Sequence, residues 1–403
     1  MLWVVYTTAY IGRANYAASI VTIIKQGIFT NTQAGLIGTI YFFCYGGWQL
    51  VNGMITDKVS PFKIILIGLT GSAVANIFMG LNSNYVVMAV IWGLNGILQA
   101  MIWAPVLYII SNIIHSDLRY KACLYIASTF PVGTLIAYFL AMICSNLKWN
   151  YVFFMSASIM FIVVFLFFLT YKKVNKLLTY REVSSNEKTK EPSNKINIKL
   201  SKLLVISGVS LVIVAVMLHG MLKEGIMTWV PTMISETYQT TPAFSIFITM
   251  ILPIINLGGA FISTFIFEKL TKRNEVLSSL FIMGFAVLPL SVILFIGEIP
   301  LAVSIVMLSL TTVSMSAFNH IYMTLAPLRF KNYNRTATIT GIFNSVTYLG
   351  CATANFGFGW LSNIFGWRNS VFFWIGIAVI AVFFCMISLK NWKKFTQNLD
   401  EEI

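Results

Sequence analysis

The sequence predicts an all-α integral membrane protein whose twelve transmembrane helices form two pseudo-symmetric six-helix bundles. Hydrophobic residues make up 58% of the 403 residues and charged residues only 10%, and the mean hydropathy is +0.82. Ordinary soluble domains do not reach this balance. Twelve apolar stretches are long enough to cross the ~30 Å hydrocarbon core of a bilayer. They fall into two sets of six around one long polar segment, and this division predicts the two bundles.

The apolar stretches divide the chain into four parts. The N-terminal bundle is expected over residues 1–171, a cytoplasmic linker loop over 172–201, the C-terminal bundle over 202–390 and a cytoplasmic tail over 391–403. The expected spans lie at about 2–24, 33–55, 62–81, 85–114, 119–144, 150–171, 203–234, 243–267, 275–297, 300–328, 336–362 and 368–389. The first span lacks the charged start and the small-residue cleavage site of a signal peptide, so we expect it to stay in the mature protein.

The basic residues predict which side of the membrane each connection faces. Of the 27 Lys and Arg residues, 22 lie in the even-numbered connections and the C-terminal tail, three lie at the opposite ends of the spans and two lie inside spans. Short cytoplasmic loops carry the excess of Lys and Arg in membrane proteins. Both termini are therefore expected in the cytoplasm. The net charge of +14 is then mainly an orientation signal, and binding to nucleic acid is not needed to explain it.

Several classes of protein are excluded by missing motifs. The nucleotide-binding pattern GxxxxGK[ST] is absent, and so are HExxH and CxxC arrays. The five cysteines are scattered, and most lie inside predicted spans, where they are expected to pack as small apolar residues. We therefore expect no enzyme activity, no cofactor, no metal site and no nucleic-acid partner. The expected state is a monomer in the lipid bilayer.

Two basic residues lie inside apolar spans, Arg13 in the first and Lys223 in the seventh. A cation near the middle of a bilayer costs about 3 kcal/mol on insertion scales and is kept where it faces a cavity or a partner. Lys223 follows Arg13 by 210 residues, and the two halves resemble each other at nearly this offset. In transporters built from such repeats the substrate site lies between the halves. One cation from each repeat therefore predicts a clamp for a single small anion.

Polar side chains are spaced to share one helix face in each of the first two spans. The residues are Tyr6, Tyr10 and Arg13 in the first span, and Tyr41, Tyr45 and Gln49 in the second. A phenol can donate to a phosphate oxygen without adding charge, and an arginine can hold two oxygens at once. A tyrosine stripe alone is more often helix packing or an interfacial belt. Together with a mid-span arginine, it favours a binding surface.

The seventh span carries three ionisable residues. His219 and Lys223 share a face, whereas Glu224 points about 100° away from Lys223. Lys223 is the predicted second anion ligand, and Glu224 or His219 is a candidate for coupling transport to protons. The alternative is that Glu224 only neutralises Lys223. The candidates for the C-terminal wall are Asn344, Tyr348 and His320, of which His320 is more typical of a hydrogen-bonded structural residue.

The segment GMITDKVSPFK between the second and third spans fits a cytoplasmic loop motif of the major facilitator superfamily. The motif residues are Gly53, Asp57, Lys58 and Lys63, with Lys63 one place beyond the usual spacing. The glycine allows close helix approach, and the aspartate can form and release a contact at a cytoplasmic gate. A plain charged turn is the alternative.

Further motifs resemble one family of that superfamily. YTTAYIGRANYAAS resembles the first helix of the organophosphate:phosphate antiporter family, which includes bacterial glycerol-3-phosphate and hexose-phosphate transporters. CYGGWQLVNGMITDKVSP, NGILQAMIWAP, LKEGIMTWVPT and TGIFNSVTYLG extend the resemblance over nearly the whole chain. It implies a multi-pass protein of the bacterial plasma membrane. It also implies that Arg13 binds phosphate, that Lys223 stands at the family's second arginine, and that tyrosines surround the substrate at Tyr6, Tyr10, Tyr45 and Tyr348.

The sequence departs from the family pattern where positive charge is expected. Lys223 replaces an arginine, which exchanges a planar fork for a point charge. Gln49 and Ala14 stand where relatives carry lysine, and STFPVG at 128–133 lacks a histidine of the glycerol-phosphate branch. These changes leave open a monoanion, a phosphonate, a zwitterionic phosphate or a carboxylate as the substrate.

The resulting expectation is a secondary active transporter. It would move a small organic anion, such as a sugar phosphate, glycerol phosphate or related phosphonate, by alternating access and in exchange for phosphate. One alternative is a proton-coupled symporter of a non-phosphorylated organic anion or other small solute. A second is a transporter-like membrane sensor, because one relative of the hexose-phosphate carriers is a receptor for a histidine kinase.

Overall fold

The computed structural model confirms the all-α prediction. It describes residues 1–56, 59–112, 118, 122, 125–126, 128–182, 199–330, 333 and 335–401. Every regular element within these ranges is helical, apart from one isolated bridge between Ile296 and Ile299.

The helices of the first half follow the apolar stretches closely. They are α1 (Leu2–Lys25), α2 (Asn31–Thr56), α3 (Pro61–Leu81), α4 (Tyr85–Asn112), α6 (Thr129–Ser145) and α7 (Tyr151–Glu182). Much of the expected span 119–144 before α6 lies outside the described residues. Helix α7 continues past residue 171 into the segment that composition marks as polar.

The second half is less regular. Its elements are α8 (Leu200–Ile206), α9 (Val209–Thr237), α10 (Pro242–Thr249), α11 (Ile251–Asn256), α12 (Gly258–Phe265), η1 (Ile266–Leu270), α13 (Glu275–Ile293), α14 (Leu301–His320), η2 (Ile321–Leu325), η3 (Ala326–Phe330) and α15 (Thr336–Glu401). The eighth span is the broken tract from α10 to η1. Helix α15 contains two spans, which meet at Gly366 with φ 75° and ψ 173°. A positive φ favours glycine, so the break falls where the sequence permits it.

The helices show the composition of a membrane protein. Eight stretches of the described chain are long and apolar enough to cross a bilayer, and one of them, Thr338–Gln397, holds both helices of α15. Helix α6 has only 17 residues, while α1 and α2 have the length but are less apolar. These three complete the twelve expected spans within the described ranges. The two less apolar helices also supply half of the residues that line the pocket described below.

The outward surface of the helices is apolar and the inside carries polar groups. Large hydrophobic side chains such as Phe261, Leu288 and Phe372 are 64–79% exposed, whereas Asn15, Asn76 and His219 are fully buried. Exposing such an apolar surface to water is unfavourable, whereas exposing it to the hydrocarbon of a bilayer is not. The helices therefore belong in a bilayer.

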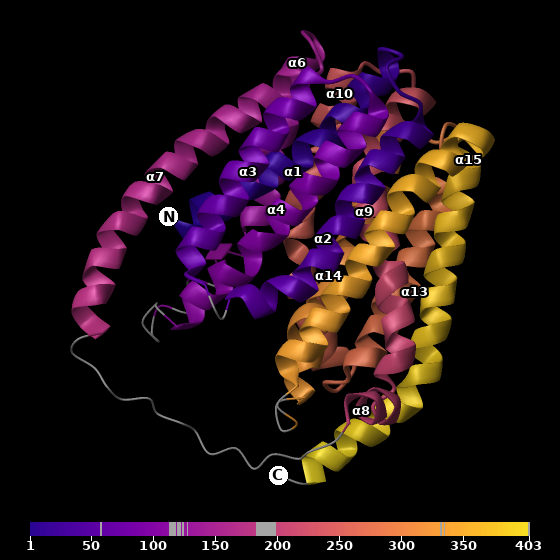
Figure 1. The fold of residues 1–403 in the computed structure, drawn as a ribbon. Coiled ribbons are helices and arrows are strands. Elements are labelled where there is room, and N and C mark those ends of the chain that lie inside the picture. Colours follow the sequence, from indigo (N-terminus) through magenta and orange to yellow (C-terminus); the bar gives the residue numbers. More distant parts are fainter. Residues whose placement is uncertain are drawn as a thin grey trace.

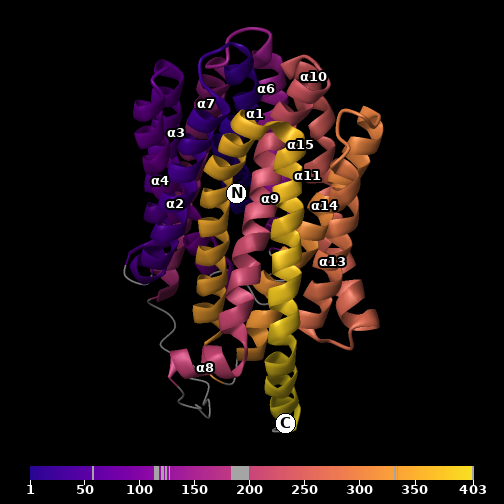
Figure 2. The ribbon, with the colours of Figure 1, turned by 90° about the vertical axis from the view of Figure 1, so that its right-hand side faces the viewer.

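The two halves lie side by side and meet along central helices. In Figures 1 and 2 the indigo-to-magenta helices α1 to α7 gather on one side and α9 to α15 on the other, with α2 beside α15. Helix α2 approaches α15 through small residues. A side chain at Gly35 would collide with the carbonyl oxygen of Asn355, and one at Gly38 with the Asn355 side chain. Glycine at these two positions therefore permits the close contact between the halves.

Hydrogen bonds join the halves at the end of the molecule where α1 leads into α2. We call Asn31, Glu236, Ser362 and Trp367 the Glu236 cluster. Glu236 accepts a 2.7 Å hydrogen bond from the Trp367 indole and a 3.5 Å bond from the Asn31 amide, and Asn31 also donates to Ser362 at 3.2 Å. Nearby, Thr39 Oγ1 donates to the Ala352 carbonyl at 2.6 Å. Because Asn31 and Thr39 belong to α2 and their partners to α9 and α15, these bonds close the interface at this end.

Candidate substrate pocket

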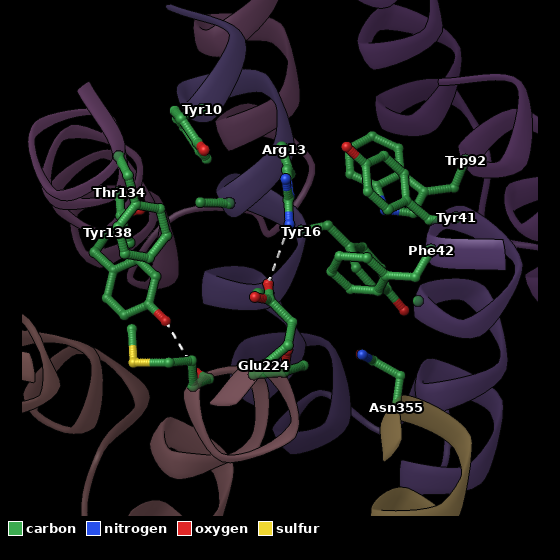
Figure 3. A pocket seen from close by; sticks show the side chains of 16 residues that line it. Tyr10, Arg13, Tyr16, Tyr41, Phe42, Trp92, Thr134, Tyr138, Glu224 and Asn355 are labelled. Atoms are coloured by element: carbon green, nitrogen blue, oxygen red, sulfur yellow. Dashed lines mark hydrogen bonds and ion pairs between the residues drawn. The ribbon is translucent and has the colours of Figure 1, made fainter. Parts of the chain in front are cut away.

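A pocket lies between the two halves, where about 560 Å³ of space, open solvent included, is free of protein atoms. Helices α1, α2, α4 and α6 line it from the first half, and α9 and α15 from the second (Figure 3). Its lining residues are Tyr10, Arg13, Ala14, Tyr16, Ala17, Gly38, Tyr41, Phe42, Trp92, Phe130, Thr134, Tyr138, Glu224, Met227, Thr228 and Asn355. The location agrees with the expectation that the site forms where the repeats meet.

Arg13 is the centre of this pocket, and aromatic rings surround it. Its guanidinium carbon lies 5.0–5.8 Å from the centroids of five rings, which we call the Arg13 cage: Tyr10, Tyr41, Phe42, Tyr45 and Tyr348. The first four come from α1 and α2, and the fifth comes from α15. Cation–π attraction stabilises an arginine in such surroundings. The rings also restrict the orientation of the guanidinium group.

The carboxylate of Glu224 faces Arg13 across the interface. Arg13 Nη2 lies 3.7 Å from Glu224 Oε1, and the two side chains are 11% and 18% exposed. Figure 3 shows the two groups pointing toward each other from α1 and α9. Two cations were expected to face each other here, but the partner that faces Arg13 is an acid. The attraction between the two charges offsets part of the unfavourable desolvation of each, and the pair links the two halves.

Lys223 lies beside the pocket, since it is absent from the lining residues. Its Nζ atom lies 5.8 Å from the centroid of the Phe130 ring, and that ring contacts the Tyr10 ring edge-to-face at 5.3 Å. Successive residues on a helix point about 100° apart. Since Glu224 takes the direction toward Arg13, Lys223 points toward α6 instead.

A family model for the Major Facilitator Superfamily matches residues 2–355 of the chain. The chain belongs to the major facilitator superfamily. The solved structures agree with this fold: a bacterial homologue of the human lysosomal transporter Spinster, in an inward-facing and unoccupied conformation, has a TM-score of 0.77 at 14% identity over 98% of this chain and 96% of that one. The nucleoside transporter NupG has a TM-score of 0.71 at 14% identity over 96% of this chain and 98% of its own.

The similarity to individual curated relatives covers shorter segments of the chain than the family model does. A probable hexose phosphate transport protein of Chlamydia pneumoniae is 34% identical over 104 residues, which are 26% of this chain and 23% of the relative. The membrane sensor protein UhpC of Salmonella typhimurium is 30% identical over 98 residues, which are 24% of this chain and 22% of that protein. The glycerol-3-phosphate transporter of Bacillus subtilis is 30% identical over 108 residues, which are 26% of this chain and 24% of that protein. The matched segments span under a quarter of these relatives. They confirm the resemblance to the organophosphate:phosphate antiporter group.

The tyrosine stripe of this superfamily member has two parts. The Tyr6 and Tyr10 hydroxyls lie 3.5 Å apart, and the Tyr6 ring stacks on Trp103 with 4.8 Å between centroids. Tyr6 does not line the pocket, whereas Tyr10 and Tyr41 do. The Tyr45 and Tyr348 rings contact each other with 4.6 Å between centroids and close the Arg13 cage. Tyr6 therefore packs against Trp103, whereas Tyr10 and Tyr41 line the candidate pocket.

Buried polar residues behind the pocket hold α1 and α2 in place. Tyr41 donates to Gln99 at 3.4 Å, Gln99 to Ser72 at 3.0 Å, and Ser72 to Asn95 at 2.5 Å. The Asn76 amide donates to the Gly12 carbonyl, next to Arg13, at 3.2 Å. Sequence reasoning missed this network, although Gln99 lies inside the motif NGILQAMIWAP. Its role is positional because it fixes Tyr41 and the backbone beside Arg13.

The C-terminal wall differs from the expected one. Asn355 lines the pocket about two helical turns beyond the expected Tyr348, while Asn344 and Gln49 are half-buried and are not lining residues. Trp92, Thr134 and Tyr138 also line the pocket and were not predicted. Asn355 and Thr134 could have been noticed as polar residues in apolar spans. The sequence does not show, however, which face of each helix points toward the pocket.

The two histidines of the C-terminal half make structural contacts. His219 is fully buried, with Nε2 2.9 Å from the Met315 carbonyl and its ring stacked on Phe318. His320 Nδ1 lies 2.8 Å from the Ser263 hydroxyl. Neither histidine lines the pocket. Among the ionisable residues of the seventh span, Glu224 is therefore the one in contact with the Arg13 side chain.

The loop motif is only partly described. Asp57 and Lys58 lie outside the described residues, Gly53 lies in α2, and Lys63 is exposed near the start of α3. Within the described ranges, no group of three or more His, Cys, Asp or Glu residues could hold a metal ion. The pocket contacts available to a ligand are those of Arg13, the surrounding hydroxyls, Asn355 and Glu224.

Proposed function

We propose that this protein is a secondary active transporter that moves a small organic anion across the bacterial cytoplasmic membrane by alternating access. The anion would be a sugar phosphate, glycerol phosphate or related phosphate or phosphonate, exchanged for phosphate. The observation that carries the proposal is Arg13, held in its aromatic cage between the two halves. The similarity to transport proteins named for hexose phosphate and glycerol-3-phosphate supports the substrate class. The predicted topology places both termini in the cytoplasm.

Binding would exchange one ion pair for another. A phosphate oxygen pair takes the Arg13 fork and the Tyr10 hydroxyl donates to a remaining oxygen. The Tyr45 and Tyr348 rings hold the Arg13 side chain, and Lys223 adds long-range positive charge. The Glu224 carboxylate is displaced, so the link between α1 and α9 opens when the ligand arrives. The ligand then shifts the equilibrium between the arrangements of the two halves. It favours the arrangements in which Arg13 pairs with phosphate over those that need the Arg13–Glu224 pair.

Counterflow in proteoliposomes tests the transport proposal. Vesicles loaded with unlabelled glycerol 3-phosphate, glucose 6-phosphate, a small phosphonate or inorganic phosphate are mixed with a trace of the same labelled compound. We expect transient accumulation, at least about tenfold above protein-free vesicles, for one or more of the organic phosphates. Inorganic phosphate inside the vesicles should support uptake if exchange is the mode. Absence of counterflow across the whole panel would contradict the proposal.

Glu224 also favours a second candidate, proton-coupled symport of a small organic anion or other solute. Protonation of a carboxylate that faces Arg13 would free the guanidinium, so proton and substrate binding would be linked. Symport predicts ligand-driven alkalinisation outside the vesicles that is lost in Glu224→Gln. Exchange with phosphate predicts no such pH change, because no proton accompanies the substrate.

The third candidate is a transporter-like sensor, which the similarity to the membrane sensor protein UhpC supports. A sensor would bind the ligand without moving it across the membrane. Ligand-induced stabilisation of the purified protein without counterflow is the result expected of a sensor, because binding alone raises the melting temperature. Sustained counterflow would eliminate this candidate.

A further inference from the structure

The charges that line the pocket cancel. Among the sixteen lining residues of the described chain, Arg13 is the one basic residue and Glu224 the one acidic residue, and their side chains face each other at 3.7 Å. Lys223 lies outside this lining, next to the Phe130 ring. The pocket therefore offers an anion site and a cation site side by side.

A plain phosphate ester fits only half of this arrangement. When its phosphate takes Arg13, the Glu224 carboxylate loses its counter-charge and stays beside a second negative group. Both effects oppose binding in a site where the two side chains are only 11% and 18% exposed. Lys223 can offset part of the repulsion, but its ammonium lies 5.8 Å from the centroid of the Phe130 ring and outside the pocket lining.

A ligand with a positive and a negative group satisfies both sites. Its phosphate pairs with Arg13 and its ammonium group pairs with Glu224, so every buried charge keeps a partner before and after binding. Aromatic side chains near Glu224 suit a cation: Figure 3 shows the Tyr138 side chain on one side of the carboxylate. The Phe130 ring also lines the pocket. Aromatic faces attract an ammonium group.

We propose that the pocket selects a zwitterionic phosphate or phosphonate, with the phosphoryl group on Arg13 and an ammonium group on Glu224. This inference rests on the proposed transport of organic phosphates and narrows its substrate class. Glu224 is then a specificity-determining residue, and Arg13 supplies the contact that all organic phosphates share.

The test compares two probes that differ only in the group that Glu224 would contact, 2-aminoethyl phosphate and 2-hydroxyethyl phosphate. Both compete with a labelled substrate in counterflow by the full-length protein, and both are titrated against the purified protein by thermal shift. We expect half-saturation by the amino compound at a concentration at least about tenfold lower. In Glu224→Gln the preference should fall to within about twofold, because the amide carries no charge. Glu298→Gln, at an exposed acid that pairs with Arg368, should keep the wild-type preference.

Two results would overturn the inference in distinguishable ways. Equal or tighter binding of the hydroxyl compound by the wild-type protein removes the zwitterion selectivity but leaves organic phosphate transport standing. Failure of both probes and of every phosphate in the wider panel removes both proposals. Where Glu224→Gln does not give a monodisperse protein, Glu224→Asp replaces it: a retained preference supports the carboxylate assignment, and the loss of the preference in a folded Glu224→Asp protein contradicts it.

Discussion

Arg13→Ala is expected to raise the half-saturation concentration for organic phosphates at least about 100-fold. Each hydrogen bond to a charged group contributes about 1.5–3 kcal/mol, and Arg13 can offer two in parallel. A loss of about 3 kcal/mol corresponds to more than a factor of 100 in affinity. Counterflow measured over a wide range of substrate concentrations checks the change. Arg13→Lys should recover only part of the loss, because a point charge cannot replace the fork.

The Arg13→Ala variant also leaves Glu224 without the Arg13 partner. Its effect on substrate binding must therefore be distinguished from its effect on the stability of the protein. Arg368→Ala is the matched control because Arg368 also pairs with a glutamate but is 54% exposed at the surface. The double variant Arg13→Ala with Glu224→Ala removes the unpaired carboxylate. If the double variant regains stability but not transport, Arg13 acts on the substrate directly. Wild-type uptake by Arg13→Ala would refute the site.

Arg329→Ala is expected to lower the free energy of unfolding by about 3–5 kcal/mol, the usual cost of removing one member of a buried ion pair. Arg329 Nε lies 2.7 Å from Glu275 Oε1, and the Glu275 side chain is only 2% exposed. The other Glu275 oxygen accepts a 3.0 Å hydrogen bond from Trp392. These contacts join α13, η3 and α15, so the loss of the arginine leaves a buried carboxylate where three elements meet. Unfolding of the purified protein in detergent, followed by heat or denaturant, measures the change.

The matched control is again Arg368→Ala. The Arg368–Glu298 ion pair has the same 2.7 Å separation, but both side chains are more than half exposed. Exposed pairs contribute about 0–1 kcal/mol, so this variant should unfold close to the wild type. Replacing both Arg329 and Glu275 by leucine should recover most of the loss, because no charge is then left buried. Equal effects of the two alanine variants would show that burial does not set the energy.

Hydropathy predicted the spans because a bilayer constrains length and polarity so strongly. The ends of α1, α3 and α4 agree with the expected stretches, since a single apolar run fills each helix. The breaks from α10 to η1 and the change of helix type after His320 were not predicted, because residues such as Pro253 and Leu257 are as apolar as their neighbours. The backbone irregularities there depend on packing between helices, which hydropathy does not report.

The lining of the candidate pocket was predicted in part. Arg13 and Tyr10 line it, and both were expected there because a charge in an apolar span needs a partner and because helical spacing places the two on one face. The Arg13–Glu224 pair was not found, although Glu224 was a candidate for proton coupling. Its identity depends on how α1 and α9 face each other across the interface, and helical spacing gives directions only within one helix. Asn355 was missed for the same reason.

The Glu236 cluster makes the two faces of the protein unequal. A ligand that approaches from the end closed by this cluster can bind only the fraction of molecules in which its hydrogen bonds are broken. The apparent dissociation constant on that face is the intrinsic constant divided by this fraction. Three hydrogen bonds across the interface, two from Asn31 and one from Thr39, oppose opening there. At about 1 kcal/mol for each bond, they are enough to give the same ligand half-saturation concentrations on the two faces that differ by orders of magnitude. The strength of this closure, as much as the pocket itself, would then set the concentration at which each face saturates, while the gradients across the membrane set the direction of net transport.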